Sequence, residues 1–76
     1  METLIAQNQS TYSLFEKIEA GARHFTILAE MDEEMPHTLQ DFTDDPMVAA
    51  SFFNLVVSNH VSPCHLQDIW EDNQMQ

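Results

Sequence analysis

The stretch PMVAASFFNLVVSNH, residues 46–60, is the longest apolar segment of this chain. Read as a helix, it gathers two serines and an asparagine into one narrow polar stripe and leaves apolar side chains over the remaining surface. Its start is marked, because two aspartates precede Pro46: their carboxylates can accept from the free N–H groups of the first turn, and proline suits the first helical position. The pattern predicts a helix over 46–59 that is buried on several sides.

The segment before it has apolar residues at helical spacing. Ser13 and Glu16 have the form of a capping box, and the stripe continues through Leu14, Ile18, Ala22, Phe25 and Leu28. This spacing predicts one long helix from about 13 to 30. Gly21 offers an alternative, because it can end a helix and leave a single strand at 22–29, which would have to pair across a dimer.

The other segments complete a helical prediction. Residues 31–45 are predicted to be a connector with a short helical turn opened by Pro36, and residues 65–72 a terminal helix capped by Ser62 and Pro63. Residues 1–9 are expected to form a loosely ordered arm, and 10–76 one acidic helical domain. The predicted fold is all-α, a small bundle of three to four helices around the central apolar helix; the alternative is α+β with the strand at 22–29.

Charge is the most unusual property of the chain. Thirteen Asp and Glu residues face only Lys17 and Arg23, so the net charge is −11 and the sequence pI is near 4.2. Such an excess destabilises a compact state by self-repulsion, which favours a function for it in binding a basic partner. Direct binding to nucleic acid is not expected, since it requires Lys and Arg to neutralise phosphates.

The acids concentrate in two segments, while both basic residues lie in the first predicted helix. The sequence therefore predicts a partner-binding surface formed by Glu30, Asp32, Glu33, Glu34, Asp41, Asp44, Asp45, Asp68, Glu71 and Asp72. Trp70, beside Glu71, is a candidate aromatic anchor, although its helical spacing favours a place in the core.

No pattern in the sequence predicts catalysis, a metal or a cofactor. His60, Cys64 and His65 are near one another, but they lack the paired spacing of structural zinc ligands. No serine lies in a nucleophile turn, and with only Gly21 there is no glycine-rich phosphate loop. The prediction is a protein that is not an enzyme, with no catalytic residues, no metal site and no cofactor.

Compartment and assembly follow from similar arguments. A single cysteine excludes an intrachain disulfide, no signal peptide is recognisable at the N-terminus, and the apolar run is too short to span a bilayer. We therefore expect a cytoplasmic protein without membrane contact. A central helix that is apolar on almost every side also predicts a homodimer.

Two functions are compatible with these observations. The first is inhibition of a basic, nucleic-acid-binding partner such as a nuclease, by carboxylates placed where phosphates would bind. Small acidic DNA mimics of phage or mobile-element anti-defence systems, and immunity proteins or antitoxins, are of this type. The alternative is a small assembly or regulatory subunit that oligomerises through its apolar helix; weak dependence of the association on salt would favour it.

Overall fold

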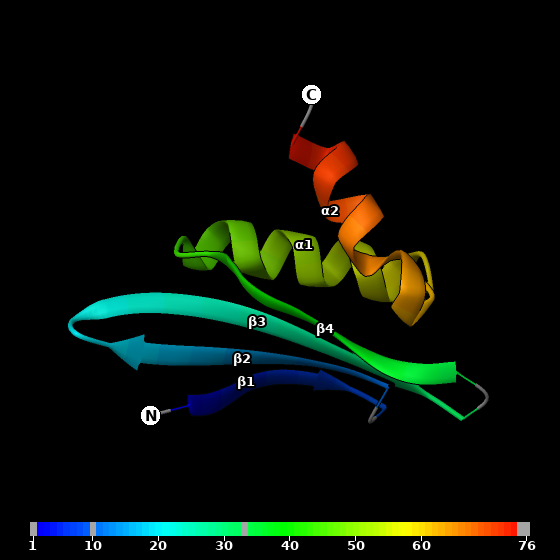
Figure 1. The fold of residues 1–76 in the computed structure, drawn as a ribbon, viewed down its shortest axis with the longest axis horizontal. Helices are drawn as coiled ribbons and strands as arrows, with labels where there is room; N and C mark the ends of the chain where they lie inside the picture. Colours follow the sequence, from blue (N-terminus) through cyan, green and yellow to red (C-terminus); the bar gives the residue numbers. More distant parts are fainter. Residues whose placement is uncertain (1, 10, 33, 75–76) are drawn as a thin grey trace.

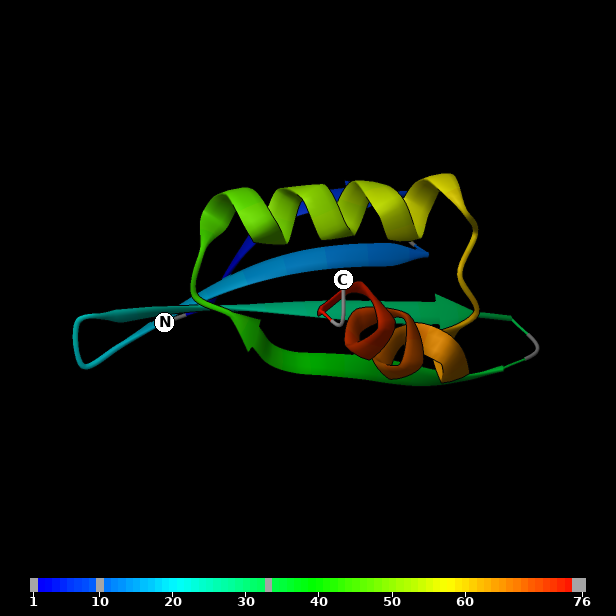
Figure 2. The same cartoon turned by 90° about the horizontal axis from the view of Figure 1, so that it is seen from above.

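The computed structural model describes residues 2–9, 11–32 and 34–74 of the chain. Four strands form an antiparallel sheet in the order β1-β2-β3-β4, and two helices lie on one face of it (Figures 1 and 2). The elements are β1 (Glu2–Asn8), β2 (Tyr12–Glu19), β3 (Ala22–Met31), β4 (Glu34–Thr43), α1 (Pro46–Ser58), the 3-10 turn η1 (Pro63–His65) and α2 (Leu66–Gln74).

The all-α prediction is wrong, because residues 13–30 form two strands instead of one helix. The buried apolar residues take every second position of a strand: Tyr12 and Leu14 in β2, and Phe25, Ile27 and Ala29 in β3, with polar or less buried residues between them. These side chains meet in register, with Leu14 opposite Ile27. The apparent helical stripe combined residues from both strands, so its spacing of three and four had no structural meaning.

The predicted alternative, a strand paired across a dimer, is also wrong about the pairing. A strand does cover 22–29, but β3 pairs with β2 on one side and β4 on the other within the same chain. The Ser13–Glu16 capping box caps nothing, because both residues lie inside β2.

A two-residue turn at Ala20–Gly21 joins β2 to β3. Glu19 pairs with Ala22, and the backbone φ angles of Ala20 and Gly21 are 54° and 78°. Two successive positive φ angles are typical of a type I′ hairpin turn, whose twist matches that of the flanking strands. Glycine adopts this conformation at no steric cost, whereas alanine does so under strain.

Ala20→Asn should therefore stabilise the protein by about 0.5–1 kcal/mol, because Asn tolerates positive φ and Asn-Gly is the preferred pair in this turn. Chemical denaturation should show a higher midpoint with an unchanged slope. Ala22→Asn, two residues along and inside β3, is the matched control and should give no gain, since Asn is unfavourable in strands. Equal stabilisation by both changes would contradict a type I′ turn.

Two further segments differ from the prediction. Most of the predicted connector is β4, and Pro36 lies in this edge strand, where a missing N–H does not interrupt a ladder on both sides. Residues 2–8, predicted to belong to a loose arm, form the opposite edge strand β1. The pairing of both edge strands contains register shifts. In β1 the shift is at residues 4–6, and in β4 the shifts lie opposite residues 25–27 and 29–31 of β3. Such bulges discourage further pairing at a sheet edge.

The prediction of a helix at the central apolar segment is confirmed by α1. Asp45 is its N-cap: Oδ1 accepts from the backbone N–H of Met47 at 2.9 Å and of Val48 at 3.4 Å, and Pro46 begins the helix. The sheet covers one side of α1, where the buried residues are Ala49, Phe52, Phe53 and Val56. Much of the apolar surface that suggested a homodimer is thus covered within the chain, and dimerisation stays a prediction.

The predicted terminal helix is present as α2, preceded by η1. Its Trp70 packs against rings from two other elements, with centroid distances of 5.0 Å to both Phe42 of β4 and Phe52 of α1. The favoured interpretation of Trp70 as a packing residue agrees with this aromatic cluster. The described residues contain no helix with the length and apolar content needed to cross a membrane.

Candidate partner-binding surface

The predicted acidic residues fall into three separate groups. Glu30, Asp32 and Glu34 surround the β3–β4 hairpin, and we call this group the acidic end. Asp41, Asp44 and Asp45 lie near the junction of β4 and α1, and Asp68, Glu71 and Asp72 lie on α2. Glu33 lies outside the described residues.

Strand formation is the reason for the separation. A ten-residue strand such as β4 is about 33 Å long, so residues at its two ends cannot contact one small site together. Figure 1 shows the β3–β4 hairpin at one end of the sheet and the start of α1 near the other. The densest acidic segment of the sequence is therefore not one continuous surface.

Both basic residues lie on the β2–β3 hairpin, away from the acidic end. Lys17 Nζ is 3.3 Å from Glu19 Oε2, and Arg23 Nε is 3.3 Å from Glu16 Oε2. Each pair is partly exposed to solvent, so it contributes little to stability. Their importance is in the charge distribution, since each cation is opposed locally by an acid that belongs to none of the three groups.

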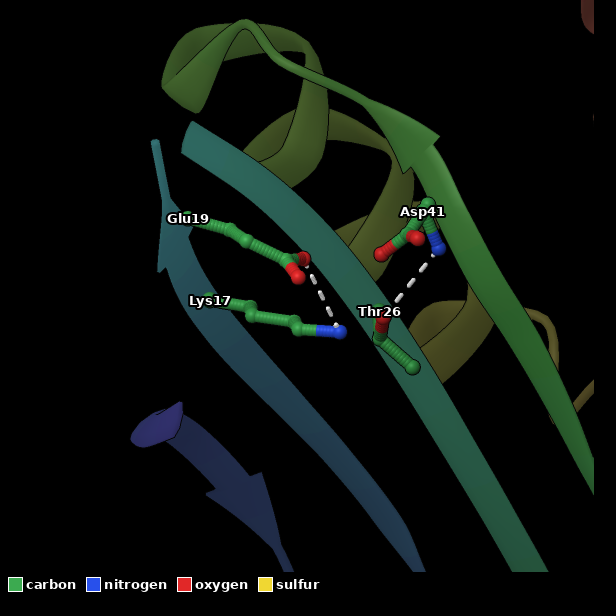
Figure 3. Close-up of polar contacts among 4 residues, drawn as sticks. All are labelled: Lys17, Glu19, Thr26 and Asp41. Atoms are coloured by element: carbon green, nitrogen blue, oxygen red, sulfur yellow. Dashed lines mark hydrogen bonds and ion pairs between the residues drawn. The ribbon is translucent and has the colours of Figure 1, made fainter. Parts of the chain in front are cut away.

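Asp41 is a weaker candidate for partner binding than its neighbours in sequence. Its backbone N–H donates to Thr26 Oγ1 at 3.1 Å, and Figure 3 shows it across β3 from Lys17 and Glu19. The pKa of Lys17 is raised, first by its hydrogen bond to Glu19 and the charge of that residue, and also by the charge of Asp41. Part of the field of Asp41 is thus opposed by Lys17.

Asp44 and Asp45 are exposed, but Asp45 already has a structural role as the N-cap of α1. Its substitution would change folding as well as binding. The acids of α2 are exposed as well, and Asp68 has one partner within ion-pair distance, His65 Nδ1 at 3.9 Å.

The acidic end has a shape as well as a charge. A hollow of about 580 Å³ opens there, lined by Glu30 and Asp32 from the β3–β4 side, by Asn8, Gln9, Thr11 and Tyr12 from the β1–β2 side, and by Met31 and His60. Carboxylates beside amide and hydroxyl groups form an acceptor-rich surface, which is suited to the N–H donors of Arg and Lys.

Tyr12 and the polar residues of the β1–β2 turn were not predicted as part of this region. They join the acidic residues only because β2 pairs with β3, which brings Thr11 beside Glu30: the Glu30 N–H donates to the Thr11 carbonyl at 2.8 Å. No local signal in the sequence could show this pairing. The pKa of Tyr12 is raised, mainly by burial and further by the negative charge of Glu34.

Other reactive side chains do not form a recognisable chemical site. No group of three or more His, Cys, Asp or Glu residues is placed to hold a metal ion anywhere in 2–9, 11–32 and 34–74. Cys64 is exposed, and its Sγ lies 3.9 Å from Glu34 Oε1, a weak hydrogen bond between η1 and β4.

The arrangement is an open surface with exposed carboxylates. In comparisons with protein-family models, with curated proteins and with solved structures, nothing matches this chain.

Proposed function

We propose that this protein binds a basic, nucleic-acid-binding protein and inhibits it by presenting carboxylates in place of phosphates. The protein acts as a stoichiometric binder, without catalysis. The observation that carries the proposal is the separation of charge: two carboxylates of the acidic end, Glu30 and Asp32, line an open hollow, while Lys17 and Arg23 are paired with other acids at the β2–β3 hairpin.

This separation matters for the electrostatic field. Opposite charges near one another cancel at a distance, whereas carboxylates without nearby cations produce a field that extends into solvent over about one Debye length, ~8–10 Å at physiological salt. A field of this kind accelerates association with a basic surface and favours it over acidic ones. Because the net charge is −11, the rest of the surface adds to the attraction.

A pair of variants with the same change in net charge tests the proposal. Glu30→Gln with Asp32→Asn neutralises the two acids of the acidic end that line the hollow, and Glu2→Gln with Glu19→Gln neutralises two acids on β1 and β2. Each immobilised protein would be used to capture binding proteins from a lysate, with elution by a salt gradient and identification by mass spectrometry. We expect a basic protein to be captured. Its affinity for the acidic-end variant should be at least about tenfold weaker, so it should elute at a lower salt concentration, whereas its affinity for the control should be nearly unchanged.

Competition completes the experiment. Double-stranded DNA of mixed sequence should displace the captured protein, because the carboxylates and the phosphates would occupy the same surface. The proposal would be contradicted if both variants retained the partner equally, if DNA did not displace it and if its elution did not depend on salt.

A further inference from the structure

An apolar groove runs between α1 and α2. Two adjoining hollows of about 480 and 300 Å³ form it, and both are lined by Leu55 and Asn73. Val48 and Ile69 add apolar side chains to its walls, and Met47, whose side chain is 79% exposed, lies at one end. Figure 1 shows α2 rising steeply from the sheet beside α1.

The charges around the groove all have one sign, apart from one histidine. Asp72 lines it on α2, and at the other end the capping carboxylate of Asp45 accepts from the backbone N–H of Met47. His65 lines the groove near Asp68. Lys17 and Arg23 are both on the β2–β3 hairpin, so no Lys or Arg opposes these acids.

We infer that this groove binds an amphipathic helix that carries Lys and Arg along its polar side, presented by the basic partner. The inference rests on the proposed function and names the element of the partner that is recognised. An apolar floor with carboxylates at both ends complements a helix with apolar residues at i, i+3, i+4 and i+7 and with flanking cations. Met47 suits such a site, because its flexible side chain adapts to different apolar partners.

A helix fits this groove better than an extended peptide. The backbone groups of α1 and α2 are bonded within each helix, so the walls offer no row of free N–H and C=O groups for a strand to pair with. A helix satisfies its own backbone and needs only side-chain contacts. The walls follow α1 from Met47 to Asn59, and such a stretch is roughly 18 Å long, which matches about three turns of a bound helix.

The probes are three synthetic peptides of about 14 residues, each roughly 21 Å long as a helix. One contains Leu and Lys with helical spacing; the second has the same composition with Leu and Lys alternating, which favours a strand; the third has helical spacing with Glu in place of Lys. Binding would be followed by anisotropy of a labelled peptide, and also by the emission of Trp70, the single tryptophan, whose ring packs on the groove residue Phe52.

We expect the helical Leu–Lys peptide to bind at least about tenfold more tightly than the alternating peptide, and to gain helical circular dichroism when bound. The Leu–Glu peptide should not bind. Met47→Ala with Val48→Ala should weaken the binding about tenfold or more, because the two truncations remove apolar wall at one end of the groove. Met35→Ala is the matched control, since Met35 is equally exposed, at 80%, but lies on β4, and it should leave the affinity within about twofold.

Other results would overturn the inference in distinguishable ways. The two Leu–Lys peptides could bind equally well, unaffected by the Met47 and Val48 changes but more weakly after Glu30→Gln with Asp32→Asn. This result would reject the groove as the binding site and would leave the proposed function unaffected. Equal binding of the Leu–Lys and Leu–Glu helices, without dependence on salt, would contradict both. Sedimentation equilibrium could instead show a dimer that the Met47 and Val48 changes dissociate, while none of the peptides binds. The groove would then be the binding site for a second copy of this chain.

Discussion

Phe52→Ala should unfold most of this protein or lower its melting temperature by on the order of 20 °C. The side chain is only 2% exposed, and its ring lies 5.6 Å from the ring of Phe42 and 5.0 Å from that of Trp70, between centroids. Removal of a buried Phe costs about 3–5 kcal/mol, while a domain of this size holds roughly 4–11 kcal/mol in total, at ~0.05–0.15 kcal/mol per residue.

The loss would also release α2, because Phe52 joins α1 to Trp70. Thermal unfolding followed by circular dichroism and by Trp70 emission measures both effects. Met47→Ala is the control on the same helix: its side chain is 79% exposed, so it should change stability by no more than about 0.5 kcal/mol. Equal melting temperatures for Phe52→Ala and Met47→Ala would show that the aromatic cluster does not hold the helices on the sheet.

Tyr12→Phe should destabilise the protein by about 1–3 kcal/mol at neutral pH, although it removes only one oxygen. The Tyr12 hydroxyl donates to the Val61 carbonyl at 2.8 Å, and both residues are buried. This bond ties β2 to the segment that leads from α1 into η1. Without it the carbonyl loses a partner that water cannot easily replace.

The same substitution has a pH dependence that identifies its cause. Burial and the charge of Glu34 raise the pKa of Tyr12 above its ordinary value of 10.0, so the folded state holds the phenolic proton more tightly than the unfolded chain does. The resulting stabilisation is complete below pH 10.0 and is lost as the pH rises through the folded-state pKa. The stability difference between the wild type and Tyr12→Phe should therefore narrow above that pH.

Denaturant titrations at a series of alkaline pH values measure this difference, and tyrosinate absorbance reports the pKa directly because Tyr12 is the single tyrosine. Glu34→Gln should lower the pKa of Tyr12 toward its ordinary value, since it removes one of the two causes. A stability difference that stays constant across the alkaline range would show that the hydroxyl is not buried.

Part of the charge pattern could be predicted from the sequence and part could not. The acid excess is a property of composition, and the positions of Lys17 and Arg23 outside the acidic segments are plain in the sequence. The sequence does not show which acids lie together, because their grouping depends on strand pairing. The hollow at the acidic end combines Glu30 and Asp32 with the β1–β2 turn, and the groove between α1 and α2 combines residues more than twenty positions apart.

The sequence by itself determined α1 and α2, the cap at Asp45 and the large negative charge. Helix hydrogen bonds join residues four apart, so the apolar run, Asp45 and Pro46 contain what α1 needs locally. Only the tertiary structure decided that residues 12–19 and 22–31 are strands. A strand satisfies its backbone through a partner elsewhere in the chain, and its spacing becomes recognisable only when the turn at Ala20–Gly21 and the register of Leu14 against Ile27 are known.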